Sequence, residues 1–317
     1  VTEALTEQLL LDGKRCTGIA YSRGGQHTEA KVTREVALSA GTIGSPQILE
    51  LSGIGQPELL QSHGIAVRHE LPAVGEYFRD HMMPRVQWCI AKAGVSYNER
   101  VRGLGLVVQA LKYAASGSGF LSLPSAPLVA FVKTRPELTT PDVQMHIVPY
   151  AVKNPKRRKL HSFASMTIAS YQLRPESLGS THIRSADPAM QPAIRFNFLA
   201  DPVDRKTTVE TVRIARRLVA APPMDAFRGA EYSPGAEVDT DDAIEAWIRE
   251  NSETSYHPIG SCRMGPDAVV NERLQVHGIK GLRVADASIF PTMPSGNTNA
   301  TAIMVGEKAA DLIRETT

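Results

Sequence analysis

The stretch that decides the fold lies near the end of the chain. It reads Ser255-Tyr256-His257-Pro258-Ile259-Gly260-Ser261-Cys262-Arg263-Met264-Gly265, then Leu282-Arg283-Val284-Ala285-Asp286-Ala287-Ser288, then Pro291-Thr292-Met293-Pro294-Ser295-Gly296-Asn297-Thr298-Asn299. His257 and Asn297 therefore stand in Gly- and Pro-rich loops on either side of a short apolar strand. Loops of this kind hold reactive groups on a rigid scaffold more often than they pack a core.

In order and spacing, these three runs resemble the C-terminal signature of the glucose-methanol-choline (GMC) family of flavin oxidoreductases. The resemblance implies that His257 is the catalytic histidine and Asn297 a second active-site residue. Asp286 ends its strand, and ligands of α/β sheets bind at the carboxyl ends of strands. Without the family motif, the simplest interpretation of Asp286 would be a turn or cap residue. The family motif favours contact with the flavin. The FAD contacts implied are Val1, Ala40, Gly41, Tyr256, Asp286, Ala287, Asn297, Thr298 and Asn299.

A second family run occurs much earlier in the chain. Residues 41–55 match the string G-T-x-x-S-P-x-I-L-x-x-S-G-I-G. From the residues alone we expect a tight turn into a helix, with Ser45 as N-cap and Pro46 as the first helical residue. The resemblance implies that this turn lies close to the flavin, where small residues let backbone N–H groups approach.

The order of elements predicts an α/β (α+β) fold with two domains. The resemblance implies that residues 1–80 and 251–317 form the remainder of a FAD-binding, Rossmann-like domain. Residues 81–250 are expected to form a substrate-binding domain, because strand-like segments that alternate in polarity predict an antiparallel sheet covered by helices. Asp80 and His81 lie where the chain crosses between the two domains. Adjacent residues of an extended chain point to opposite faces, so we expect structural roles for this pair.

Two segments of the substrate-binding domain need separate mention. A helix is expected from Leu104 to Ser116, because Leu104, Val107, Val108, Leu111 and Ala115 fall on one stripe. Lys153 to Lys159 is a basic run, and a solvated loop is its simplest interpretation.

Composition limits the partners. The formal net charge of +2 gives no reason to expect nucleic acid or an anionic membrane. No apolar run approaches the length of a membrane span, so association with a membrane would be peripheral at most. The three cysteines, Cys16, Cys89 and Cys262, have unrelated spacings and predict neither disulfides nor a metal site. A reducing compartment, the cytoplasm, is therefore expected.

The resemblance implies oxidation of a primary alcohol to an aldehyde. Such a reaction takes a proton from oxygen and a hydride from carbon, and the hydride goes to flavin N5. Neutral imidazole is a suitable base near neutral pH, which gives His257 its role, and Asn297 would hydrogen-bond the substrate oxygen. The electron acceptor is oxygen or a quinone-like compound, and the sequence favours the quinone-like compound. Two alternatives stay open: a cyanohydrin lyase that keeps FAD as a structural element, and a non-catalytic fragment.

One family feature is absent from the sequence. No G-x-G-x-x-G fingerprint for the FAD pyrophosphate occurs in the 317 residues, and the chain begins at Val1 inside a strand-like segment. We therefore expect a missing N-terminal FAD-binding segment, and weak or no FAD binding by this chain alone.

The substrate is predicted to be a neutral alcohol rather than choline. Choline-oxidising members of the family place a glutamate just ahead of a G-G-F sequence, and the corresponding stretch here is Ser125 to Phe131. Residues 121–131 contain no Asp or Glu. A quaternary ammonium needs a carboxylate or an aromatic cage, whereas Leu128, Val129 and Phe131 suit an alkyl or aryl chain. The alternative is that this segment is a core strand and the pocket lies elsewhere.

Overall fold

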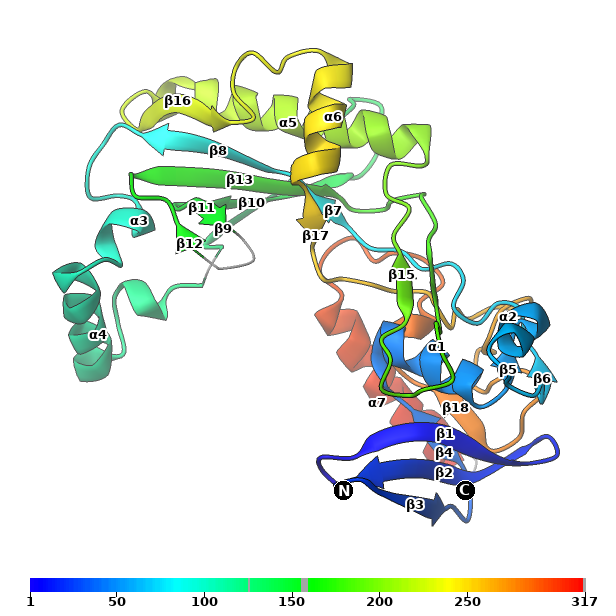
Figure 1. Cartoon of the computed structure of the whole chain (residues 1–317). Helices are drawn as coiled ribbons and strands as arrows, with labels where there is room; N and C mark the ends of the chain where they lie inside the picture. The colour runs from blue at the N-terminus through cyan, green and yellow to red at the C-terminus, as the bar shows by residue number, and fades with distance from the viewer. Residues whose placement is uncertain (125, 155–158, 316–317) are drawn as a thin grey trace. The chain divides into compact units, whose positions relative to one another are not determined.

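A computed structural model describes residues 1–124, 126–154 and 159–315, and Figure 1 shows the course of the chain. The chain separates into two compact units. The first comprises Val1–Asp80, Arg174–Asp201 and the chain from Tyr256, and the second comprises His81–Leu173 and Pro202–Ser255. This division differs from the predicted one in residues 174–201, which the prediction gave to the substrate-binding domain, and in a return point at Tyr256 rather than at residue 251.

The first unit begins with an antiparallel meander and closes with a parallel strand pair. The meander consists of β1 (Leu5–Asp12), β2 (Arg15–Arg23) and β3 (Gln26–Lys31); the last of these strands was not predicted. The parallel pair joins β4 (Val36–Leu38) to β18 (Leu282–Val284), two segments from opposite ends of the chain. Strand β18 is buried throughout, as predicted, whereas in β4 only Leu38 is fully buried.

Around this pair, apolar side chains from α1, β18 and α7 form one core, which includes Leu49, Val284 and Leu312. The remaining elements of the unit are α1 (Gly41–Leu51), β5 (Ile54–Gly55), α2 (Pro57–Ser62), β6 (His69–Glu70), β14 (Ser180–His182), β15 (Ala193–Arg195), η3 (Ala287–Ile289) and α7 (Asn299–Glu315).

Helix α1 begins at Gly41, five residues before the predicted first helical residue, so the prediction of Ser45 as N-cap is wrong. The physical reason lies in the carboxylate of Asp286. Its Oδ2 accepts a hydrogen bond from the Gly41 N–H (3.0 Å) and another from Ser45 Oγ (2.6 Å). A distant side chain thus supplies the acceptor that a local cap residue would supply, and the helix gains a turn.

Residues 174–201 belong to the first unit because they pack on α1. The side chain of Glu50, which is fully buried, accepts from the Ile183 N–H (2.8 Å) and lies 2.6 Å from His182 Nδ1. His182 Nε2 lies 3.2 Å from Glu76. Burial would lower the pKa of His182, but the hydrogen bond to Glu50 and the charges of both carboxylates outweigh it and raise that pKa.

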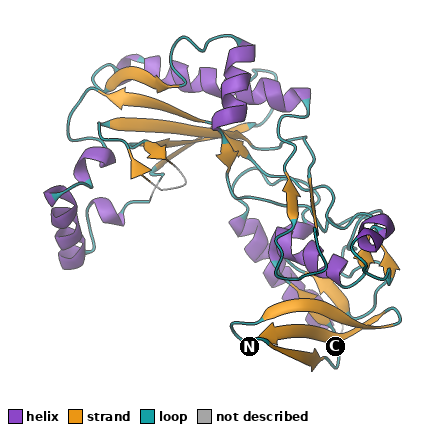
Figure 2. Cartoon of the chain, in the orientation of Figure 1, coloured by secondary structure: helices purple, strands orange, loops and turns teal. Residues whose placement is uncertain are grey.

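The second unit is built on an antiparallel sheet of five strands in the order β16-β8-β13-β10-β9, which confirms the predicted sheet. Strand β13 is buried at every residue, and helices α5 and α6 lie on one face of the sheet, as Figures 1 and 2 show. The elements are β7 (Met82–Met83), β8 (Arg85–Ile90), α3 (Tyr97–Arg100), α4 (Leu104–Ser116), η1 (Phe120–Ser122), β9 (Leu128–Val132), β10 (Val143–Val148), β11 (Val152–Asn154), β12 (Lys159–Leu160), β13 (Ser165–Gln172), α5 (Pro202–Ala220), η2 (Pro222–Met224), β16 (Arg228–Ser233), α6 (Asp241–Asn251) and β17 (Glu253–Thr254).

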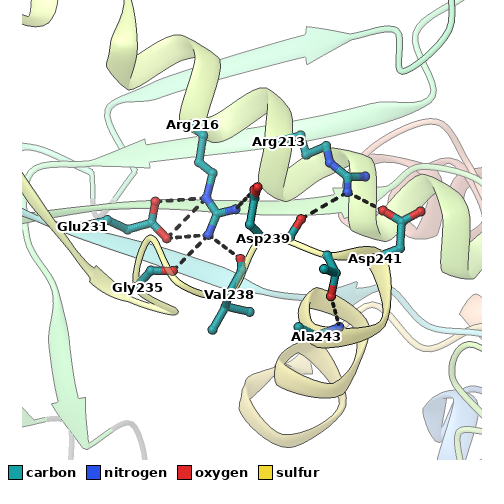
Figure 3. Close-up of polar contacts among 9 residues, drawn as sticks. Arg213, Arg216, Glu231, Gly235, Val238, Asp239, Asp241 and Ala243 are labelled. Atoms are coloured by element: carbon teal, nitrogen blue, oxygen red, sulfur yellow. Dashed lines mark hydrogen bonds and ion pairs between the residues drawn. The ribbon is translucent and has the colours of Figure 1, made fainter.

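Arg216 of α5 holds this helix against the edge of the sheet (Figure 3). Its guanidinium forms a bidentate pair with Glu231 of β16, with the shortest contact at 2.9 Å, and donates to the carbonyl oxygens of Gly235 (3.1 Å) and Val238 (2.8 Å). Both charged side chains are largely shielded from solvent. One planar guanidinium makes all these bonds at once. They therefore fix the position of α5 relative to the loop before α6.

Helix α4 has the predicted bounds, but every residue of its predicted apolar stripe is exposed. The predicted solvated loop at Lys153 to Lys159 falls mostly on residues 155–158, which lie outside the described residues. Cys16, Cys89 and Cys262 are free. In the described ranges, no helix combines the length and the apolar character that crossing a bilayer requires.

Candidate active site

His257 and Asn297, the predicted pair, meet in the first unit although forty residues separate them. Asn297 Nδ2 lies 3.1 Å from His257 Nε2. An amide nitrogen can only donate, so Asn297 donates and Nε2 of His257 accepts in this contact. A ring nitrogen that accepts here is also placed to accept a proton from a substrate, as a general base does. The ring is half-buried and Asn297 is exposed.

The backbone around His257 is held from both sides. Asp80, which is 4% exposed, accepts from the His257 N–H through Oδ1 (3.0 Å). Arg79 and Ile259 exchange two backbone hydrogen bonds, at 2.9 and 3.1 Å. Gly260 follows at φ +89°, and a Cβ there would come within 2.5 Å of the carbonyl oxygen of Tyr77. The loop therefore has little freedom to move the imidazole.

Pro46 gives the loop a further anchor. Inside a regular helix the N–H of residue 46 would donate to the carbonyl of Thr42, but proline has no N–H. That carbonyl accepts instead from Ser261 Oγ at 2.5 Å. In return, Thr42 Oγ1 donates to the carbonyl of Pro258 at 2.8 Å. Two reciprocal bonds thus fasten the glycine-rich turn of α1 to the residues that follow His257.

Asp286 brings together two of the predicted flavin-contacting segments. Besides Gly41 and Ser45, its carboxylate accepts from the Ser288 N–H (2.7 Å). The carbonyl of Ala287 accepts from the Gly260 N–H (3.3 Å). Since both oxygens of Asp286 already serve protein donors, its observed role is to join the two segments.

The other predicted FAD contacts lie at exposed or partly exposed positions. Ala40 is exposed, and its N–H donates to Ser45 Oγ at 3.1 Å. Tyr256 is 75% exposed and Val1 is 88% exposed. Thr298 and Asn299 begin α7, where the first N–H groups of the helix have no partner within it.

Asp80 and His81 serve separate roles, as their alternation predicts. Asp80 holds the backbone of His257, as described above. His81 Nε2 lies 3.1 Å from the carbonyl of Leu173, and its ring stacks on Tyr171 at 4.3 Å. Both contacts of His81 are structural and lie in the second unit.

A hollow of about 900 Å³, lined by both polar and apolar residues, also lies in the first unit. Glu76, Tyr77, Arg195, Asn197 and Asp267 are among its lining residues, and His257 and Asn297 are not among those that the structure describes there. By size alone this hollow would be the first candidate for an active site. Its described lining, however, lacks the imidazole and the amide that His257 and Asn297 provide. We therefore place the candidate active site at the pair.

Sequence reasoning missed Thr42, Ser261 and the bond from Asp80 to the His257 loop. The signal for the first two was present: a proline inside a helix leaves a carbonyl four residues earlier in need of a donor. Which donor fills that need depends on tertiary contacts. Asp80 was expected to be structural, but the sequence did not show that its partner is the backbone of His257.

Comparison with known proteins agrees with this architecture. Two family models, both described as GMC oxidoreductase, match residues 1–83 and 175–306. The oxygen-dependent choline dehydrogenase of Serratia proteamaculans is 40% identical to this chain, and that of Ectopseudomonas mendocina is 39% identical. The matches cover 100% and 99% of this chain but only 58% and 56% of those proteins.

Solved structures give the same result. Formate oxidase from Aspergillus oryzae RIB40 matches with a TM-score of 0.90 and 26% identity, over 100% of this chain and 60% of that protein. An FAD-dependent oxidoreductase from Chaetomium thermophilum matches with a TM-score of 0.88 and 25% identity, over 100% of this chain and 61% of that protein. The motifs, the fold and both family models lead to one conclusion: the chain belongs to the GMC oxidoreductase family of FAD-dependent enzymes.

Proposed function

We propose that this protein takes part in the FAD-dependent oxidation of a primary alcohol to an aldehyde, with His257 as the base. The observation that carries the proposal is the 3.1 Å contact between Asn297 Nδ2 and His257 Nε2, made by residues from two separate family motifs. The chain spans less than two thirds of the length of the curated relatives it matches.

The residues present suit a flavin. Gly41 adopts φ +80°, and no heavy atom lies within 4 Å of where its Cβ would be. The turn therefore offers open space beside its backbone. On the first turns of α7, Ile303 (59% exposed) and Met304 (55% exposed) present apolar surface next to the positive end of the helix. Gly41, Ala287, Thr298 and Asn299 would hold the cofactor, which, when bound, accepts the hydride.

The chain's own residues would handle the proton and the geometry. Neutral His257 would take the hydroxyl proton at Nε2, the nitrogen that faces Asn297. The amide of Asn297 would then donate to the substrate oxygen as its negative charge develops. Asp80 and Thr42 would keep the imidazole in place, since they bind the backbone on either side of it.

The test is His257→Ala in the full-length, FAD-loaded protein, assayed with an artificial electron acceptor. We expect kcat to fall about 10²–10⁴-fold, which is the usual contribution of a general base, with unchanged flavin absorbance per protein. His27→Ala is the matched control, because His27 is 77% exposed and lies outside the site. Near-wild-type turnover in His257→Ala would exclude His257 as the base.

One alternative, a cyanohydrin lyase, gives a different result in the same preparation of the full-length protein. A lyase would leave the flavin colour unchanged when an alcohol is added without oxygen, whereas alcohol oxidation bleaches it. Binding of FAD by the 317-residue chain alone is predicted to be weak. A yellow, stoichiometrically loaded monomer would refute that prediction.

For the substrate we propose a neutral alcohol. The names of the bacterial relatives favour choline, but residues 121–131 carry no acid. On β9, which is an edge strand, Leu128 (60% exposed) and Phe131 (51% exposed) present apolar side chains. A side-by-side assay of choline with straight-chain and benzylic alcohols distinguishes a choline enzyme from one that acts on neutral alcohols. A kcat/KM for choline above that of every neutral alcohol would contradict the proposal.

A further inference from the structure

Helix α4 carries its apolar side chains outward. Leu104 is 84% exposed, Leu111 is 65% exposed and Val108 is 58% exposed. Helices of water-soluble domains normally turn such a stripe toward the core. All residues of α4 are described, and none of them is buried.

The polar edge of α4 is the edge that contacts the protein. Gln109, on this edge, is half-buried, and its Oε1 accepts from the Phe120 N–H of η1 at 3.4 Å. Lys112 lies one turn further on the same edge, and its side chain packs beside Gly119. The helix is therefore docked through Gln109 and the methylene groups of Lys112, and its apolar face stays in contact with solvent.

The charges on and beside this helix are mostly positive. Arg100 and Arg102 lie just before α4 and Lys112 lies on it, whereas the acidic residues nearest in the sequence are Glu99 of α3 and Glu137, which pairs with Arg135 at 3.3 Å. Arg102 donates to the carbonyl of Leu160 (3.2 Å), which places it beside β12 and β11, the strands that carry Lys159 and Lys153. The pKa of His161, next in the chain, is lowered by burial and by the charges of Lys153 and Arg102, as expected for such a cluster. The net charge of +2 for the whole chain conceals this local excess.

We propose that α4, η1 and the basic residues beside them dock this protein on an anionic lipid bilayer. An exposed apolar helix face flanked by Lys and Arg is the pattern of helices that lie in the membrane interface. Anionic headgroups would neutralise the cluster while acyl chains receive the leucines. A second copy of the chain is a poor occupant, because it would bring the same positive charges against these. A nucleic acid would leave the leucines without an apolar contact. The proposal is independent of the proposed reaction.

The test is co-sedimentation of the 317-residue chain with vesicles. We expect binding to phosphatidylcholine vesicles that contain phosphatidylglycerol, weak binding to phosphatidylcholine alone, and release by salt. Arg100→Gln with Arg102→Gln should weaken binding about 30-fold, from about 5-fold per basic residue. Leu104→Ser with Leu111→Ser should weaken it at least about 100-fold, from about 10-fold per leucine.

The controls are matched changes elsewhere on the same unit. Val203→Ser and Lys206→Gln alter exposed residues of α5 and should bind as the wild type does. Thermal unfolding should be unchanged in every variant, because all four altered residues near α4 are exposed. Failure of the wild type to sediment with phosphatidylglycerol vesicles, or undiminished binding by the leucine variant, overturns the proposal. So does leucine-dependent self-association, seen by light scattering, in a chain that ignores vesicles.

Discussion

Replacing Glu50 tests whether its buried cluster stabilises the first unit. Glu50 is fully buried, and it serves both His182 (2.6 Å) and the Ile183 N–H (2.8 Å). Glu50→Ala leaves a backbone donor unpaired and removes the anion beside a histidine whose side chain is only 18% exposed. Removal of one partner of a buried pair costs about 3–5 kcal/mol. Glu50→Gln keeps an acceptor for Ile183 and loses only the charge, so we expect about 1–3 kcal/mol.

The same cluster predicts a pH dependence with a definite sign. The folded state raises the pKa of His182, so the folded protein binds this proton more tightly than the unfolded chain does. The resulting stabilisation is complete below about pH 6.5, the ordinary value, and is lost as the pH rises through the folded-state pKa. Glu50→Gln removes the main cause of the raised pKa, so its stability should vary less over the same range.

Hydrogen exchange by mass spectrometry, on peptides that cover α1 and β14, measures this effect where it occurs. Both tryptophans, Trp88 and Trp247, lie in the second unit, and their fluorescence during urea unfolding reports on that unit separately. Glu58→Ala, an exposed change on α2, is the control and should stay within about 0.5 kcal/mol of wild type. The reasoning would be refuted if α1 and β14 in Glu50→Ala kept the hydrogen-exchange protection of the wild type. It would also be refuted if the stabilities of wild type and Glu50→Gln varied in parallel with pH.

Three further predictions concern the His257 loop. Thr42→Val removes the bond to the Pro258 carbonyl and should lower kcat about 10-fold at unchanged flavin content, whereas Thr42→Ser should restore it; equal activity in both variants would exclude Thr42 as a positioning residue. Gly260→Ala forces a Cβ to within 2.5 Å of the Tyr77 carbonyl and should destabilise the protein by about 1–3 kcal/mol in thermal unfolding, so an unchanged Tm would contradict the backbone argument. Cys262 is buried, and burial raises the pKa of its thiol well above the usual value, so it should resist alkylation in the native protein; rapid labelling in mass spectra would show otherwise.

Sequence patterns predicted those elements well that depend only on residues close together in the chain. Hydrophobic spacing placed Leu104–Ser116 as a helix with the observed bounds, and alternation placed the antiparallel sheet of the second unit. The same spacing could not show which way the α4 stripe faces. Orientation depends on what packs against the helix, and here the contact is made through Gln109.

Long-range contacts explain what the sequence could not show. Ser45 has every local property of an N-cap, yet Asp286 takes over the start of α1 from 241 residues away. Family motifs marked His257 and Asn297, and the structure adds the distance between them. The segment 174–201 looked like part of the substrate-binding domain because its neighbours in the chain belong there. Its place in the first unit depends on Glu50, whose partners no periodicity predicts.

The parallel pairing of β4 with β18 has a consequence for synthesis. Beside this pair, Ser39 Oγ donates to the carbonyl of Ala285, 246 residues later. At about 5–20 residues per second, a ribosome needs roughly 12–50 s to cover that interval. All strands of the second unit's five-stranded sheet leave the ribosome before β18 does, so that sheet can assemble while β4 still waits for its partner. Because Asp286 and Asn297 follow β18, a chain released before Asp286 would carry a finished second unit and no candidate active site.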